Sequence, residues 1–132
     1  MALIAACSTQ KNAANNQSST SSLYQKWQLV HIERIASEEA EQSQTNFREK
    51  NLFVTFSQEG KMSFNFDVNS CSGSFKEGAN RSLSFNNTDF KCTLICCDTI
   101  KINYLSVKRY EIQKNMLRLY SDKEIFHLER AK

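Results

Sequence analysis

Apolar and polar residues alternate one by one in two neighbouring segments, NLFVTFS (51–57) and KMSFNFD (61–67). A period of two puts every second side chain on the same face of an extended strand, whereas an amphipathic helix needs apolar residues three to four positions apart. The QEGK stretch (58–61) between the segments is typical of a tight turn. These residues therefore predict a β-hairpin with one apolar face.

Strand-like runs of the same kind continue along most of the chain. YQKWQLVHIE (24–33) places Trp27 and Leu29 on one face. Five further runs lie at 70–77, 81–87, 108–113, 116–122 and 124–130, with turns near Gly78, at 114–115 and at 122–123. About eight strands at such close spacing predict an antiparallel meander that curls into a barrel-like or sandwich domain.

Two segments do not follow this pattern. Residues 34–50 are polar and charged, which indicates a long loop or a short surface helix. In residues 93–106 four apolar side chains are spaced as in one stripe of a helix: Leu94, Ile95, Ile102 and Leu105. Part of this second segment would also serve as a strand. We therefore expect a mainly β fold (α+β) with one short helix.

The N-terminal stretch ALIAAC (2–7) is typical of the end of an export signal. An apolar residue, two small residues and then Cys7 resemble the bacterial lipobox, in which the cysteine is acylated. Only six residues precede Cys7 and none of them is basic, so a complete signal would have to begin upstream. We interpret residues 1–7 as a truncated lipoprotein signal remnant and expect a lipid on Cys7.

Residues 8–23 are predicted to form a polar tether. Up to residue 22 this stretch has no aliphatic side chain larger than alanine. Such a segment cannot bury enough surface to offset the entropy of ordering, so we expect it to be disordered. It would link an acylated cysteine to a folded domain at 24–132.

Composition narrows the possible functions. The 132 residues carry a formal net charge of +3. The basic residues are scattered and do not interleave with aromatic ones, so we do not expect nucleic-acid binding. No apolar stretch has the roughly 20 residues that a membrane-spanning helix needs. His31 and His127 lie far apart in expected strands and no nucleophile motif accompanies them, so we expect neither enzyme activity nor a cofactor.

Four cysteines remain when Cys7 is set aside: Cys71, Cys92, Cys96 and Cys97. An even number of thiols in an oxidising compartment predicts two disulfides. A bond between the adjacent Cys96 and Cys97 would close a strained ring. We therefore expect Cys71 to pair with one of these two residues and Cys92 to pair with the other. The same thiolates, with His31 or His127, could instead bind zinc or copper(I), although C-x-x-x-C-C lacks the C-x-x-C pairs of a structural zinc site.

Several short motifs follow one another in a recognisable order. W-x-L begins at Trp27, a hairpin leads into NSCSGSF (69–75), TLICC (93–97) comes next, and YEIQKNMLRLYSD (110–122) lies near the end. This order resembles the META domain (HslJ-like) family, over residues 26–129. The resemblance implies that the following residues occupy signature positions of the family: Trp27, Asn69, Gly73, Phe75, Thr93 and Cys97.

These signature residues are expected to have structural roles. Gly73 would let a neighbouring segment approach its strand closely. The Asn69 amide could hold adjacent backbone, and Thr93 could cap the helix suspected after it. The chain departs from the family pattern at Val68, where many members have cysteine, and at Cys71, which takes an aromatic position. A disulfide of the family therefore cannot be transferred to this chain.

The family resemblance implies a small envelope-associated domain without catalysis. We therefore expect a non-enzymatic lipoprotein of the bacterial cell envelope, held by its lipid on the periplasmic or surface side of the outer membrane. Its domain would be a monomeric binding or structural module for an unknown envelope protein or ligand, stabilised by disulfides. The alternative is an envelope protein that binds zinc or copper through the cysteine cluster.

Overall fold

The computed structural model describes residues 22–35, 44–96, 100 and 102–132 of the chain. Ten β-strands form in these residues: β1 (Lys26–Arg34), β2 (Gln44–Asn46), β3 (Phe53–Phe56), β4 (Lys61–Phe66), β5 (Asn69–Glu77), β6 (Leu83–Phe85), β7 (Lys91–Cys92), β8 (Arg109–Gln113), β9 (Met116–Tyr120) and β10 (Glu124–Arg130). Short 3₁₀ turns lie at Arg48–Lys50, Ala79–Arg81, Asn87–Asp89 and Tyr104–Ser106.

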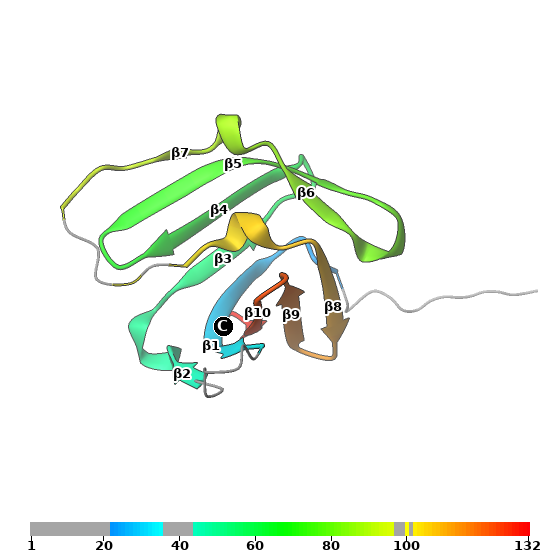
Figure 1. The fold of residues 1–132 in the computed structure, drawn as a ribbon, viewed down its shortest axis with the longest axis horizontal. Helices are drawn as coiled ribbons and strands as arrows, with labels where there is room; N and C mark the ends of the chain where they lie inside the picture. Colours follow the sequence, from blue (N-terminus) through cyan, green and yellow to red (C-terminus); the bar gives the residue numbers. More distant parts are fainter. Residues whose placement is uncertain (1–21, 36–43, 97–99, 101) are drawn as a thin grey trace, which may run out of the picture.

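The strands make one antiparallel sheet with the order β6-β5-β4-β3-β1-β10-β9-β8. β2 pairs with β1, and β7 pairs with β5, beside this main path. Since β1 pairs with both β3 and β10, the sheet curls round until β6 and β8 approach each other (Figure 1). This is the up-and-down order of a meander, and the predicted antiparallel β fold is confirmed as a nearly closed barrel.

The gap between β6 and β8 is crossed by a few specific contacts. Ser82 and Arg109 form an isolated bridge, and the Leu83 amide donates to the Lys108 carbonyl at 2.8 Å. Glu77 of β5 accepts hydrogen bonds from the hydroxyls of Tyr24 and Tyr110. These contacts tie the start of the domain, β5 and β8 together at the open side of the barrel.

The hairpins lie where the sequence predicts them. β3 and β4 are joined through a turn at which Gly60 has a φ of +85°, a value that favours glycine. Two residues connect β8 to β9, with Lys114 in the left-handed region at φ 58°. The expected strand faces are also confirmed, because Leu52, Val54 and Phe56 are all buried.

Large side chains from nearly every strand fill the barrel interior. The largest fully buried ones are Trp27, Tyr104, Phe56 and Phe126. The Trp27 indole N–H donates to the Leu23 carbonyl at 3.0 Å, and Leu23 is itself buried in the core. The folded domain therefore includes Leu23, which the sequence placed at the end of the tether.

The prediction of a helix within 93–106 is wrong for the described part of that segment. Residues 93–96, 100 and 102–106 contain no α-helix and only the 3₁₀ turn at Tyr104–Ser106. Leu94 is 94% exposed and Ile95 is 57% exposed, so they do not share a buried stripe with Ile102 and Leu105, which pack against the core. Asn69 binds both backbone groups of Ile95, which fixes that residue outside a helix.

The 34–50 segment also differs from its prediction. Gln44–Asn46 pairs with β1 as a third neighbour, so part of the segment is a strand rather than a loop or helix. Phe47 packs against the core and its amide donates to the Val30 carbonyl at 2.7 Å. Residues 36–43 lie outside the described part of the chain.

Candidate binding site

Cys71 and Cys92 form a disulfide across two paired strands. They stand directly opposite each other in the β5–β7 pair, with their Cα atoms 4.0 Å apart. The predicted pairing of Cys71 with Cys96 or Cys97 is therefore wrong. The reason is topological: β7 folds back beside β5, and antiparallel register brings Cys92 opposite Cys71 before the chain reaches the second cysteine pair.

The other cysteines are only partly described. Cys96 is also in a disulfide. Cys7 and Cys97 lie outside the described residues, as do the predicted lipobox and most of the tether. Among the residues that the structure describes, no group of three or more histidine, cysteine or acidic side chains is placed to hold a metal ion. No helix in this part of the chain is long and apolar enough to span a membrane.

Asn69 and Thr93 form a second link beside the disulfide. Asn69 is buried, and its Oδ1 accepts hydrogen bonds from the Thr93 hydroxyl at 2.6 Å and from the Ile95 amide at 2.8 Å. Its Nδ2 donates to the Ile95 carbonyl at 2.8 Å, and Thr93 Oγ1 accepts from the Ser70 amide at 3.1 Å. Asn69 therefore holds adjacent backbone, whereas Thr93 caps no helix and bonds to the start of β5.

Trp27, Gly73 and Phe75, which were expected to have structural roles, lie in or against the core. Trp27 and Phe75 are buried in the core, and Phe75 packs edge-on against Phe56 with ring centroids 5.1 Å apart. At Gly73, a Cβ atom would lie 2.5 Å from the ring of Phe90. The close neighbour predicted for Gly73 is thus an aromatic side chain.

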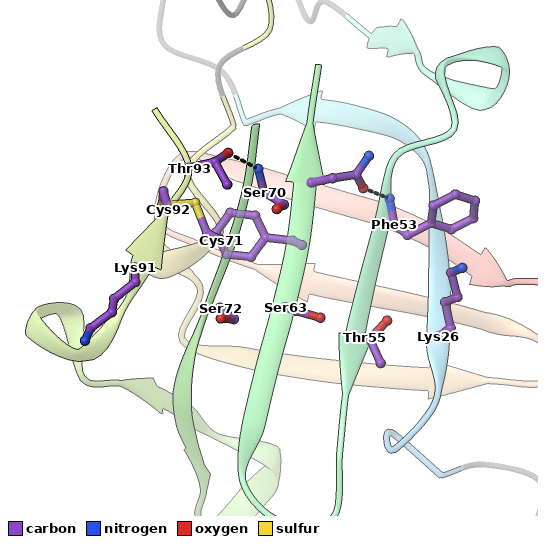
Figure 2. Close-up of a pocket in the computed structure, with 12 residues that line it drawn as sticks. Lys26, Phe53, Thr55, Ser63, Ser70, Cys71, Ser72, Lys91, Cys92 and Thr93 are labelled. Carbon is purple, nitrogen blue, oxygen red and sulfur yellow. Dashed lines mark hydrogen bonds between the residues drawn. A yellow bond between two sulfur atoms is a disulfide. The ribbon is translucent and has the colours of Figure 1, made fainter. Parts of the chain in front are cut away.

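A shallow groove of about 650 Å³ crosses the outer face of the sheet over β7, β5, β4, β3 and the start of β1 (Figure 2). Its centre is a row of side chains that strand pairing places side by side: Lys91, Ser72, Ser63, Thr55 and Lys26. The row runs perpendicular to the strands, one residue from each (Figure 2). Four strand spacings of about 4.8 Å make it about 19 Å long between its lysine backbones.

The polar groups of this row have few contacts within the protein. Within the described part of the chain, the hydroxyls of Thr55, Ser63 and Ser72 make no side-chain hydrogen bond, and Lys26 and Lys91 make no ion pair. The Lys26 ammonium lies 4.2 Å from the centroid of the Phe53 ring. The row is therefore open to an external ligand along its whole length.

The groove is positively charged. Its lining includes Lys26 and Lys91 and no acidic residue. Near the groove, the carboxylate of Asp89 accepts a hydrogen bond from the Ser74 hydroxyl. That bond lowers the pKa of Asp89, with the charges of Lys61 and Lys91 acting in the same direction. Asp89 thus lies close enough to Lys61 and Lys91 for their charges to act on its carboxylate.

Several charges elsewhere on the barrel are paired. On β8 and β9, Glu111 lies 3.3 Å from Arg109 and 4.0 Å from Arg118. A second groove, of about 420 Å³, holds both Lys108 and Asp122, whose charges meet at 3.0 Å. In the groove over β5 and β4, Lys26 and Lys91 make no ion pair within the described part of the chain.

No local sequence pattern predicts the whole of this row. The hairpin turn at 58–61 fixes Thr55 opposite Ser63, so part of the row could have been found from the turn alone. Lys26 and Lys91 join it through pairings between strands that are distant in sequence, which no local pattern reveals.

Comparison with known proteins supports the fold. No family model matches the chain, and no curated protein matches it in sequence. A crystal structure of a DUF4847 family protein from Bacteroides vulgatus is similar with a TM-score of 0.55 at 13% identity, over 83% of this chain and 94% of that one. An NMR structure of a protein from Burkholderia xenovorans is similar with a TM-score of 0.61 at 14% identity, over 94% and 98%. At these identities the similarity establishes a shared fold alone.

Proposed function

We propose that this chain is a META/HslJ-like lipoprotein of the bacterial cell envelope, whose barrel is a non-enzymatic binding module. The row from Lys91 to Lys26 is its binding site. The observation that carries this proposal is the alignment of two unpaired lysines and three unengaged hydroxyls along one groove. Polar groups that the protein leaves unpaired on a concave surface are available to fix a ligand.

Binding is favoured over catalysis by the chemistry of the groove. A hydrolytic serine needs a base within hydrogen-bond reach. Ser63 and Ser72 are flanked in the row by hydroxyl and ammonium groups, and the groove lining contains neither histidine nor carboxylate. An ammonium that is charged at neutral pH attracts anions but accepts no proton.

The disulfide argues against the metal-binding alternative. Zinc and copper(I) bind cysteine as the thiolate, and a disulfide sulfur cannot supply one. Cys71, Cys92 and Cys96 are all oxidised, which removes three of the four thiols that a metal site would use. We therefore retain the lipoprotein proposal alone.

The anchoring part of the proposal is tested by mass spectrometry of the protein isolated from its native host. We expect an N-terminal peptide that begins at Cys7 and carries lipid. Cys7→Ser should release the protein into the soluble fraction without changing its melting temperature, because this residue lies outside the core. An unmodified Cys7 still joined to Ala6 would contradict the anchoring proposal.

The binding part is tested by filling the groove. Ser63 and Ser72 stand opposite each other, so a Ser63→Tyr/Ser72→Tyr double variant places a favourable aromatic pair over the row. In the soluble Cys7→Ser background, this variant should lose cosedimentation with washed envelope fragments. Gln113→Tyr, on exposed β8, is the matched control and should bind normally. Equal binding by the blocked and control proteins would show that the site lies elsewhere.

A further inference from the structure

We propose that the ligand of the groove is an extended acidic polysaccharide that lies across the strands from Lys91 to Lys26. This inference rests on the proposed function, because it names the chemistry of the ligand for the same site. Three properties of the row support it, namely its charge, its length and the neutral hydroxyl groups at its centre.

Charge complementarity requires an anionic ligand. The two lysines at the ends of the row are exposed, and among the described residues neither has an acidic partner within ion-pair distance. Lys61, one row away opposite Ser74, adds a third positive charge to the same face. A groove with cations and no lining carboxylate concentrates anionic ligands and repels cationic ones.

The length of the row requires an extended ligand. The lysine backbones lie about 19 Å apart, so a ligand that follows the whole row must be extended. A chain that bears acidic groups at intervals can contact both lysines at once. The second contact then forms as an intramolecular event, which raises the affinity without any new chemistry.

The centre of the row favours a carbohydrate. Ser72, Ser63 and Thr55 each offer one O–H donor and acceptor lone pairs, and none of them carries a charge. Hydroxyl groups of a sugar chain are donors and acceptors of the same kind. The three protein hydroxyls form a polar strip between two cationic ends. This arrangement matches a chain of sugar rings with acidic substituents.

Aromatic accessibility argues against single-stranded nucleic acid. Such ligands are held mainly by bases that stack on exposed aromatic side chains. Of the two aromatic residues that line the groove, Phe64 is buried and the ring of Phe53 lies beneath the Lys26 ammonium. Neither ring face is presented for stacking.

The Cys71–Cys92 disulfide helps to position one end of this site. Lys91 belongs to β7, which is only two residues long, and Cys92 of the same strand is bonded to Cys71. Since Ser72 pairs with Lys91 in that ladder, the disulfide holds one cationic end of the row beside the first hydroxyl. Reduction should therefore weaken ligand binding as well as stability.

The test is calorimetric titration of the full chain carrying Cys7→Ser with galacturonate oligomers long enough to span the row. We expect binding to the acidic oligomer and none to its methyl-esterified form, which keeps the sugar backbone without charge. Lys26→Gln/Lys91→Gln should weaken binding about tenfold, equivalent to about 1.4 kcal/mol. Lys114→Gln/Lys123→Gln removes the same charge from exposed turns and should change affinity less than about twofold, because distant surface charges are screened.

A further double variant tests whether the hydroxyl groups contribute to binding beyond general charge attraction. Ser63→Ala/Ser72→Ala keeps every charge and should still weaken binding to the acidic oligomer. Equal weakening by the two lysine double variants would overturn the proposal in favour of non-specific attraction. Stronger binding of an oligothymidylate, lost in Lys26→Gln/Lys91→Gln, would assign the groove to nucleic acid and also overturn it.

The outcomes separate this inference from the proposed function. If the acidic oligomer does not bind but the Ser63→Tyr/Ser72→Tyr variant still loses envelope fragments, the ligand class is wrong and the binding site stands. If neither experiment responds to changes in the groove, both proposals fail.

Discussion

His31 and His127 stack on each other across β1 and β10. Their ring centroids are 4.1 Å apart, and His127 Nε2 lies 2.9 Å from Glu33 Oε1. Glu33 thus provides a local partner for the His127 ring. Burial lowers the pKa of His31 from its ordinary value, helped by the nearby charges of His127 and Arg48 and opposed by Glu33. The folded protein therefore favours the neutral form of His31.

The lowered pKa of His31 predicts that the protein loses stability on acidification. The unfolded chain protonates His31 near pH 6.5 and the folded chain only at lower pH, so the unfolded state binds more protons between these values. The melting temperature should fall as the pH drops below about 6.5. His31→Gln should make this fall shallower between about pH 7 and pH 5.5. If wild type and variant lose stability in parallel, His31 does not act as described.

A side chain at position 73 is expected to clash with its neighbour. Its added Cβ would sit 2.5 Å from Cγ and Cδ1 of Phe90, closer than real contacts allow. Gly73→Ala should lower the free energy of unfolding by about 1–3 kcal/mol, as overpacking does. Urea unfolding measures the change, and the Phe90→Leu background should recover part of it. A cost that is the same in both backgrounds would exclude the Phe90 contact as its cause.

At the scale of single elements, β7 decides the geometry of the groove. It has two residues, and Lys91 and Cys92 pair with Ser72 and Cys71. The Cys71–Cys92 bond and the Asn69–Thr93 hydrogen bonds hold the segment after β7 against β5 from two sides. A strand this short cannot be stable by pairing alone, so these links are needed to keep Lys91 in the row.

The Cys71–Cys92 disulfide is expected to contribute a measurable share of the free energy of unfolding. The two cysteines are 21 residues apart, and closing such a loop contributes about 3 kcal/mol in the chain-entropy model. Cys71→Ala/Cys92→Ser should lower the melting temperature, and the reducing agent should lower it in the wild type too. Reduction will also act on the disulfide of Cys96, so the double variant isolates this bond. A variant that melts like the unreduced wild type would contradict this role.

The sequence predicts elements well where the information is local. The alternation in 51–57 and 61–67 and the turn between them are enough to define β3 and β4. The error at 93–106 has a tertiary cause, because Asn69, 26 residues away, binds the backbone of Ile95 and prevents a helix there. The wrong prediction of the Cys71 partner has the same kind of cause, since the spacing of the cysteines does not reveal that β7 pairs with β5.

At the scale of the whole molecule, pairing of β1 with β10 decides between a barrel and a sandwich. The meander order was predictable from the turns, but this closure joins strands at opposite ends of the domain. Its seven paired positions include a register shift between Leu29 and His31. The remaining opening lies between β6 and β8 (Figure 1). Glu77 of β5 contacts Tyr24 and Tyr110 there.

This opening gives a prediction for local stability. Glu77→Gln keeps the shape of the side chain and weakens two hydrogen bonds to a charged acceptor, at a cost of about 1–3 kcal/mol. Backbone amides of β8 and β6 should then exchange with deuterium faster, while those of β3 and β4 change little. Equally faster exchange across the barrel would show that Glu77 stabilises the whole domain and not the opening between β6 and β8 in particular.

The proposed function depends on ligand binding at the row from Lys91 to Lys26, and an NMR titration tests this binding most directly. The isotope-labelled full chain carrying Cys7→Ser is titrated with galacturonate oligomer while backbone amide resonances are followed. We predict that the largest shifts fall on the groove strands, at Thr55, Ser63 and Ser72, and that they vanish in Lys26→Gln/Lys91→Gln. Largest shifts on β8–β10, or none in the groove strands at saturating oligomer, would contradict the proposed site.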